Sequence, residues 1–223
     1  MPAWKHAALL VAFLLVAVLA GCGGDGPADV DPIPFPETPD QLMADFRQAY
    51  GERDIDGYRD ALHADFTFVF AADSPAAPPG GAFSREQELA TSGRMFDGEQ
   101  GWDFEGWPKP GVLGIDIYRF ERRTDWLDVP LDDSRFPGSR RAVYDVQIVL
   151  LLDTPAHSTI TIDSRQDFYV VSEPVVRRDG PARLRCSLVG QRDYGPEDPA
   201  ALLLSSEAMS WGSVKAVYSP PDR

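Results

Sequence analysis

The stretch LMADFRQAYGERDIDGYRDALHADFTFVF, residues 42–70, decides the fold because its apolar residues follow helical spacing in two segments and then alternate with a period of two. Leu42, Phe46 and Tyr50 recur at helical spacing, which predicts an amphipathic helix. The same spacing returns in residues 53–63 and predicts a second, shorter helix. The end of the stretch instead places a phenylalanine at every second position, as in a half-buried strand. The stretch therefore predicts helix, helix and strand in that order.

Residues that cap or terminate helices mark the ends of both predicted helices. Thr38 precedes Pro39, so Thr38 can cap the first helix and Pro39 suits its first turn. Gly51 is expected to close that helix. Asp54 is placed to cap the second helix. The DIDG segment that it begins matches only part of a calcium-binding loop, so capping is the preferred interpretation.

The predicted strand carries an aromatic face. Phe66, Phe68 and Phe70 alternate along it, so their side chains are expected to point to the same side. Because two amphipathic helices come directly before them, we expect these rings to pack beneath those helices as the centre of the core.

Residues 42–70 also resemble the opening of an NTF2-like (SnoaL-like) domain, in which two helices carrying a Tyr or Trp lead into an aromatic strand. Residues 84–96, SREQELATSGRMF, are similar to the third helix of lipoprotein members of that group, with Ser84 as its cap. Residues 210–218, SWGSVKAVY, resemble their closing segment. The resemblance implies an α+β fold, an NTF2-like cone whose N-terminal helices pack on a strongly curved, mainly antiparallel sheet. It places this domain at residues 39–218.

Four further segments are rich in β-branched and aromatic residues and are expected to form the long strands of the sheet. They are residues 115–123, 142–152, 158–171 and 184–194. The polar segment DTPAH separates the middle two and is expected to turn the chain into a hairpin. If the hairpin pairs Leu152 with Thr159, the register of both strands follows.

In that register, one face of the hairpin is apolar near the turn and polar farther from it. The face carries Val149, Leu151, Ile160 and Ile162, and then Gln147, Ser164, Asp145 and Gln166. Because NTF2-like cones often enclose a ligand cavity on the concave face, a pocket is expected at the polar end. Its candidate lining residues are Tyr50, Tyr58, Asp145, Gln147, Ser164 and Gln166.

The pocket residues allow two interpretations. Ketosteroid-isomerase-like members of this fold use a buried carboxylate as base beside a tyrosine donor, and Asp145 with Tyr50 or Tyr58 would supply such a pair. The catalytic positions of that family do not map onto this sequence residue by residue. We therefore prefer the interpretation in which neighbours such as Gln166 hydrogen-bond Asp145, which then serves structure alone. No catalytic residue is assigned.

Other residues with reactive side chains have simple structural explanations. His63 is expected at the end of the second helix, where the helix dipole favours it, whereas a dehydratase-like pair would need His63 and His157 near one cavity. Cys186 is interpreted as a small core residue. Three tryptophans in connecting segments are expected to cover the rim of the sheet, or alternatively to form an aromatic lip for a hydrophobic ligand or partner. They are Trp102, Trp107 and Trp126.

The N-terminus is typical of a lipoprotein signal peptide. Lys5 supplies a positive charge, and residues 7–20 form an uninterrupted apolar segment shorter than a membrane-spanning helix. The segment ends in Leu-Ala-Gly-Cys, which resembles a bacterial lipobox and implies cleavage before Cys22 and acylation of that cysteine. An ordinary secretory signal or an uncleaved anchor is the alternative. We expect residues 1–21 to be the signal peptide and residues 22–38 a flexible linker rich in Gly, Pro and Asp.

The net charge and the N-terminal segment limit the classes of function that the sequence supports. The formal net charge of -14 disfavours nucleic acid as a partner, and we expect no cofactor and no metal. The sequence therefore predicts a lipid-anchored protein of the bacterial cell envelope with a non-catalytic ligand-binding or scaffolding domain. The alternative is an isomerase or dehydratase that uses a pocket in the cone.

Expected partners are the membrane, through the lipid on Cys22, and a hydrophobic small molecule or an envelope protein, while the oligomeric state is left open. Gly23, rather than Asp, follows the cysteine. By resemblance to the sorting pattern of enteric lipoproteins, this implies the periplasmic face of the outer membrane.

Overall fold

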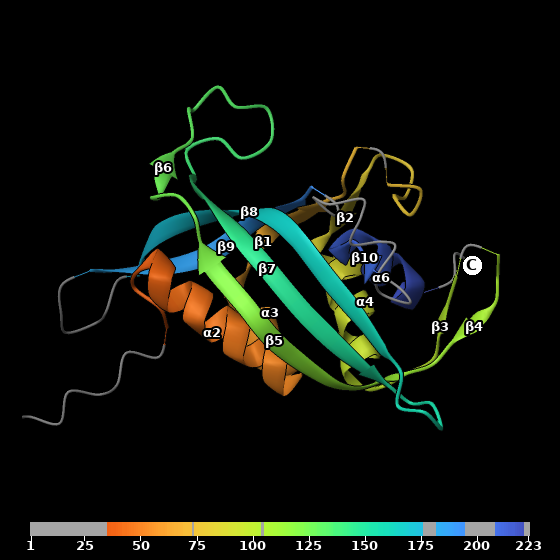
Figure 1. Cartoon of the computed structure of the whole chain (residues 1–223). Helices are drawn as coiled ribbons and strands as arrows, with labels where there is room; N and C mark the ends of the chain where they lie inside the picture. Colours follow the sequence, from red (N-terminus) through yellow and green to blue (C-terminus); the bar gives the residue numbers. More distant parts are fainter. Residues whose placement is uncertain (1–34, 73, 104, 176–181, 195–207, 221–223) are drawn as a thin grey trace, which may run out of the picture. The chain divides into compact units, whose positions relative to one another are not determined.

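The computed structural model describes residues 35–72, 74–103, 105–175, 182–194 and 208–220 (Figure 1). The predicted signal peptide, Cys22 and most of the predicted linker lie outside these residues. The described helices are α2 (Pro39–Glu52), α3 (Ile55–Ala61), α4 (Arg85–Phe96) and α6 (Trp211–Tyr218). Among the described residues, no helix is both long and apolar enough to cross a membrane.

The strands form one large mixed sheet and one short hairpin. The large sheet has the order β2-β1-β9-β8-β7-β5, with two short strands, β6 and β10, added to β7 and β8. Its strands are β1 (Leu62–Val69), β2 (Ala82–Ser84), β5 (Val112–Arg122), β6 (Leu127–Asp128), β7 (Arg140–Leu152), β8 (Thr159–Val175), β9 (Arg183–Asp193) and β10 (Ala208–Met209). The hairpin joins β3 (Gly101–Trp102) to β4 (Pro108–Lys109).

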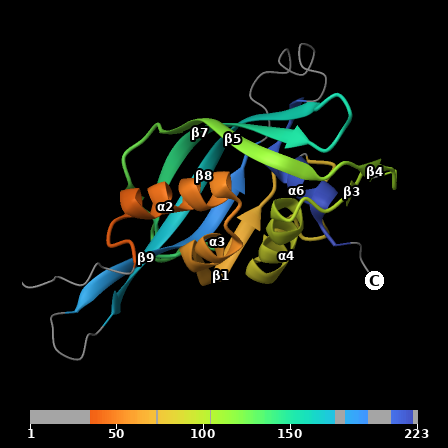
Figure 2. The ribbon, with the colours of Figure 1, turned by 90° about the horizontal axis from the view of Figure 1, so that it is seen from below.

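Most neighbouring strands of the large sheet run antiparallel, whereas β1 pairs with β9, and β10 with β8, in parallel. Helices α2, α3 and α4 gather on one face of this curved sheet (Figure 2). We call the helix-covered face the inner face and the opposite face the outer face. The arrangement is the one that the NTF2-like resemblance implied, so the predicted α+β fold with N-terminal helices on a mainly antiparallel sheet is confirmed.

The predicted caps start the helices. Thr38 Oγ1 accepts the backbone N–H of Gln41, and the Gln41 side chain accepts the N–H of Thr38 in return. Asp54 caps α3, and Ser84 caps α4 through the same reciprocal arrangement.

The predicted end of the first helix at Gly51 is wrong. Helix α2 continues through this glycine to Glu52, and Arg53 ends it in a left-handed conformation with φ 58°. The turn falls there because Asp54 must start the next helix immediately afterwards. The Arg53 side chain is held by its Nη1, which donates to the carbonyl of Val112 at 3.1 Å. A hydrogen bond to β5 therefore supports a conformation that non-glycine residues rarely adopt.

The aromatic face predicted for residues 64–70 is confirmed. Phe66, Phe68 and Phe70 are all buried, and the Phe68 and Phe70 rings meet edge to face at 5.1 Å between centroids. On the inner face, the ring centroids of Phe46 of α2 and Phe168 of β8 are 5.6 Å apart. Aromatic side chains of the helices and of the sheet therefore belong to one core.

The predicted register of the β7–β8 hairpin is wrong by one residue. Leu151, not Leu152, lies opposite Thr159. Leu152 still donates its N–H to the carbonyl of Ser158, while Thr154 Oγ1 accepts the Ser158 N–H and His157 adopts a positive φ of 48°. Because Leu152 bonds to Ser158, five residues (153–157) lie between these two, whereas the predicted pairing of Leu152 with Thr159 would leave six. Because side chains alternate between faces, the shift moves the β7 residues of the predicted polar face to the outer face.

We expect Phe68→Ala in the full chain to lower the free energy of unfolding by about 3–5 kcal/mol, because Phe68 is fully buried. Urea denaturation measures the change. Leu131→Ala is the matched control, since this side chain is 86% exposed, and its effect should stay within about 0.5 kcal/mol. Equal stability of the two variants would contradict the assignment of Phe68 to the core.

Candidate functional site

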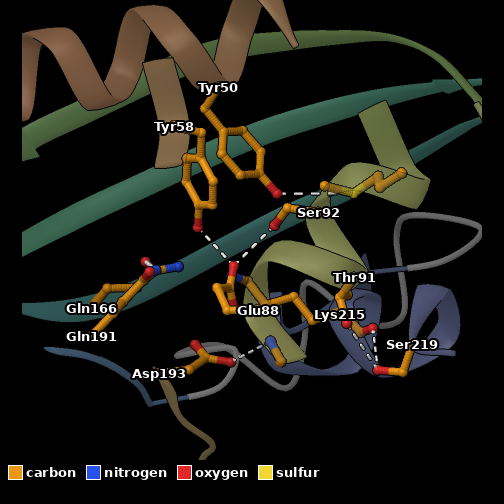
Figure 3. A network of polar contacts seen from close by, with 12 residues as sticks. Tyr50, Tyr58, Glu88, Thr91, Ser92, Gln166, Gln191, Asp193, Lys215 and Ser219 are labelled. Carbon is orange, nitrogen blue, oxygen red and sulfur yellow. Dashed lines mark hydrogen bonds and ion pairs between the residues drawn. The ribbon is translucent and has the colours of Figure 1, made fainter. Parts of the chain in front are cut away.

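The inner face holds a buried polar network around Glu88 of α4 (Figure 3). Glu88 Oε1 accepts the Tyr58 hydroxyl at 2.7 Å and the Ser92 hydroxyl at 2.9 Å, and it forms an ion pair with Lys215 of α6. Both charged side chains are at most 1% exposed. The network therefore joins three helices, α3, α4 and α6, through one carboxylate oxygen.

Aromatic rings surround the ammonium group of Lys215. Its Nζ lies 4.4 Å from the centroid of the Phe68 ring and 5.3 Å from that of Trp211, within the range of cation–π attraction. Burial lowers the pKa of Lys215, and the negative charge of Glu88 opposes that shift. The amine is therefore stabilised as a cation chiefly by one carboxylate and two ring faces.

Two tyrosines of the predicted pocket belong to this network or border it. Tyr50 of α2 and Tyr58 of α3 are buried. In Figure 3 the Tyr58 hydroxyl points to Glu88, whereas the Tyr50 hydroxyl points to the Met95 sulfur, 3.9 Å away. Burial raises the pKa of both hydroxyls well above the usual value, and the charge of Glu88 adds to the shift. Both groups consequently act as neutral donors.

Two further predicted residues lie on the same face. Ser164 and Gln166 of β8 are buried, and Gln166 Nε2 donates to Ser164 Oγ at 3.1 Å. Gln191 of β9 in turn donates to Gln166 Oε1 at 2.5 Å. The structure therefore brings Tyr50, Tyr58, Ser164 and Gln166 to the inner face.

The prediction that Asp145 and Gln147 share this face is wrong. Both point to the outer face because the β7 register differs by one residue from the predicted one. Asp145 forms an ion pair with Arg123, and Gln147 Nε2 lies 3.4 Å from Asp163 Oδ2. Gln166 was also predicted to hydrogen-bond Asp145, and this prediction is wrong because the two side chains lie on opposite faces of the sheet.

The remaining candidates lie elsewhere. His63 belongs to β1 rather than to a helix end, and its ring faces Glu173 at 3.4 Å. His157 belongs to the β7–β8 turn. Cys186 is 1% exposed in the core, as predicted. Of the three tryptophans, Trp126 packs against the core and donates to Asp40, whereas the other two, Trp102 and Trp107, are exposed.

Neither of the charged residues at the centre of the network, Glu88 and Lys215, was predicted from the sequence. Glu88 and Ser92 are four residues apart, on the same face of α4 as the buried Met95. Lys215 interrupts an apolar segment of α6. A charged residue on the buried stripe of each helix is the signal that could have identified them.

The network places acid and amine in contact with each other and surrounds them with side chains. A general base needs a lone pair directed toward a substrate. Glu88 Oε1 instead receives three donors from the protein itself. Among the described residues, Glu88 Oε2, Gln191 Oε1 and Trp211 Nε1 are buried polar atoms without a hydrogen-bond partner.

Solved structures with a similar arrangement come from several bacteria. An NTF2-like protein of unknown function in nutrient uptake from Rhodospirillum rubrum is 15% identical, with a TM-score of 0.41 over 69% of this chain and 94% of its own. An NTF2-like protein of unknown function from Cytophaga hutchinsonii is 11% identical, with a TM-score of 0.38 over 77% and 99%. A putative aromatic ring hydroxylase from Novosphingobium aromaticivorans is 11% identical, with a TM-score of 0.44 over 69% and 83%.

These likenesses carry no argument about function, because identities and TM-scores are low. No protein-family model and no curated protein matches the sequence.

We expect Glu88→Gln to leave the Lys215 ammonium buried without its anion and to cost about 3–5 kcal/mol of unfolding free energy near neutral pH. Without the carboxylate, burial holds the pKa of folded Lys215 further below that of the unfolded chain. The unfolded state then binds more protons, so stability rises with pH and the loss should shrink as the pH approaches about 10.4, the pKa of an unfolded lysine. Urea unfolding at several pH values measures this.

The control for this variant is Glu99→Gln, which removes a half-exposed carboxylate paired with Arg94 and should change stability little at any pH. Combining Glu88→Gln with Lys215→Met should recover part of the loss, because no unpaired charge then stays buried. A loss that is independent of pH, or that the double variant does not reduce, would contradict the assignment of the buried pair.

Proposed function

We propose that this protein is a bacterial lipoprotein, anchored through lipid on Cys22 at the periplasmic face of the outer membrane. Its NTF2-like domain is a non-catalytic ligand-binding or scaffolding module. The observation that carries the non-catalytic part is the contact of Glu88 with Lys215, in which the buried acid and the buried amine neutralise each other. Glu88 Oε1 receives Lys215 and two hydroxyl donors, so this oxygen is not available as a free base for a substrate.

The aromatic filling of the inner face supports the same proposal. Phe46, Phe168 and Trp211 occupy the space between the helices and the sheet and are at most 2% exposed. An isomerase of the alternative class needs a carboxylate that a substrate can reach, whereas Glu88 is completely buried. The predicted base, Asp145, lies on the opposite face.

A binding role is supported by the unpaired polar atoms next to this network. Buried polar atoms are normally hydrogen-bonded, either to protein or to ordered water. Glu88 Oε2, Gln191 Oε1 and Trp211 Nε1 offer two acceptors and one donor. A water molecule or a small polar ligand on the inner face would satisfy such groups.

The lipid anchor is supported by the sequence alone. Residues 7–20 supply an apolar segment of signal-peptide length, and Leu-Ala-Gly-Cys ends it at Cys22. Several acyl chains on one residue attach a protein stably to a bilayer, which a single chain does not. In this proposal, residues 22–38 then separate the domain from the membrane surface.

We expect Cys22→Ser, expressed in a bacterial host, to abolish labelling with a radioactive fatty acid and to release the protein from membranes. Cys186→Ala is the matched control, because the buried Cys186 cannot be the acylation site and labelling should persist. Undiminished labelling of Cys22→Ser would refute the anchor.

We also expect the purified full chain to leave the isomerisation of a β,γ-unsaturated ketone at its solvent rate, monitored by ultraviolet absorbance. Glu88→Gln serves as the comparison, because it removes the only described carboxylate in contact with Lys215. Acceleration by the wild-type protein that disappears in Glu88→Gln would support the isomerase alternative and overturn the non-catalytic assignment.

A further inference from the structure

The outer face of the sheet carries ion pairs between carboxylates of β7 and β8 and arginines of neighbouring strands. Asp163 of β8 pairs with Arg119 at 2.5 Å, and Asp167 of β8 pairs with Arg141 at 2.7 Å. Asp145 of β7 pairs with Arg123, as described above. Alternating charges of this kind stabilise a sheet surface modestly and would by themselves need no ligand.

A groove interrupts this surface at one end of the outer face. Its volume is about 970 Å³. The lining residues, which we call the arginine groove, are Arg123, Thr124, Arg141, Val143, Arg165, Asp167 and Tyr194. Three arginines and one aspartate line the groove, and two of the arginines are paired with carboxylates, Arg123 with Asp145 and Arg141 with Asp167.

Two of these arginines are held by only one edge of the guanidinium group. Arg123 contacts Asp145 through Nε, and Arg141 contacts Asp167 through Nε. Among the described residues, their terminal Nη atoms have no hydrogen-bond partner. Arg119, outside the groove, differs because it uses Nη2 to contact Asp163. The groove therefore contains two oriented guanidinium groups whose outer donors remain available.

A buried acceptor lies among these donors. Asp167 is 0% exposed, and its Oδ2 accepts from Arg141 and from the hydroxyls of Tyr194 and Tyr169 at 2.7–3.3 Å. Its Oδ1 has no hydrogen-bond partner among the described residues. A buried carboxylate oxygen without a partner is costly, so a donor from a bound molecule would stabilise it.

We propose that the arginine groove binds a hydroxylated organic phosphate, whose anionic oxygens contact the Nη atoms of Arg123 and Arg141 while a hydroxyl donates to Asp167 Oδ1. Arginine suits this role because its planar donors match the oxygens of a phosphate. The required hydroxyl distinguishes such a ligand from a simple anion. Soluble sugar or glycerol phosphates and the headgroup of phosphatidylglycerol share this chemistry.

The test is calorimetric titration of the purified protein, kept in an uncharged detergent for every variant. The probes are glycerol 3-phosphate, inorganic phosphate, glycerol and water-soluble dihexanoyl phosphatidylglycerol. We expect glycerol 3-phosphate to bind at least about tenfold more tightly than inorganic phosphate or glycerol. Affinity should fall as salt is added, because the contacts are charged.

Variants locate the site. Arg123→Gln and Arg141→Gln should each weaken binding by about tenfold or more, since each removes a charge-assisted contact. Arg119→Gln is the matched control, with the same change of charge on the same face but outside the groove, and binding should persist. Arg123 is 59% exposed, so its variant should fold even if loss of Arg141 disturbs Asp167. Circular dichroism verifies folding.

The results distinguish a lipid headgroup from a soluble phosphate as the ligand, and some of them would refute the proposal. Binding of dihexanoyl phosphatidylglycerol without glycerol 3-phosphate assigns the groove to a lipid headgroup, and the reverse assigns it to a soluble phosphate. Failure of both probes overturns the proposal, as does equal weakening by Arg119→Gln. Inorganic phosphate binding as tightly as glycerol 3-phosphate would refute the role of Asp167. None of these outcomes depends on acylation of Cys22 or on the absence of catalysis.

Discussion

The pairing of β7 with β8 determines which residues of the sheet face the helices. Leu151 lies opposite Thr159 because residues 153–157, which include Thr154 and His157, form the turn between Leu152 and Ser158. A slip of one residue would turn Tyr144 outward and Asp145 inward, placing a carboxylate against aromatic rings. In the existing register, the Tyr144 and Phe168 rings meet edge to face with 5.2 Å between centroids, and Asp145 pairs with Arg123. Both the inner network and the arginine groove depend on this choice of faces.

Once the faces are fixed, the contact of Glu88 with Lys215 ties α4 to α6 across the inner face. A buried ion pair contributes little net stability, because both charges lose their hydration. Its geometry is nevertheless demanding, since Tyr58 must reach the same oxygen and the Phe68 ring must lie beneath the ammonium group. Misplaced packing would leave a buried charge unpaired. We infer that the pair selects one arrangement of the helices more than it stabilises the fold.

Local features of this structure could be predicted from the sequence, and contacts between distant segments could not. The caps at Thr38, Asp54 and Ser84 act over three residues, so their signals are complete within the sequence around them. The hairpin register depended on a left-handed residue, His157, that no local pattern marks. Glu88 and Lys215 are 127 positions apart, and each resembles an ordinary surface charge until its helix is placed.

The two faces use their charges in different ways. On the inner face, the carboxylate and the amine meet directly, so the pair presents no charge to a ligand. At the arginine groove, Asp145 contacts Nε of Arg123 and Asp167 contacts Nε of Arg141. These contacts balance the charges of the two guanidinium groups and leave their Nη donors unoccupied. At long range the field of a chain with net charge -14 repels polyanions such as nucleic acids. At contact distance, oriented donors can still attract a small anion, because screening by water and salt weakens the long-range field more than a hydrogen bond. An acidic protein can in this way exclude phosphate polymers and still bind a single phosphate group.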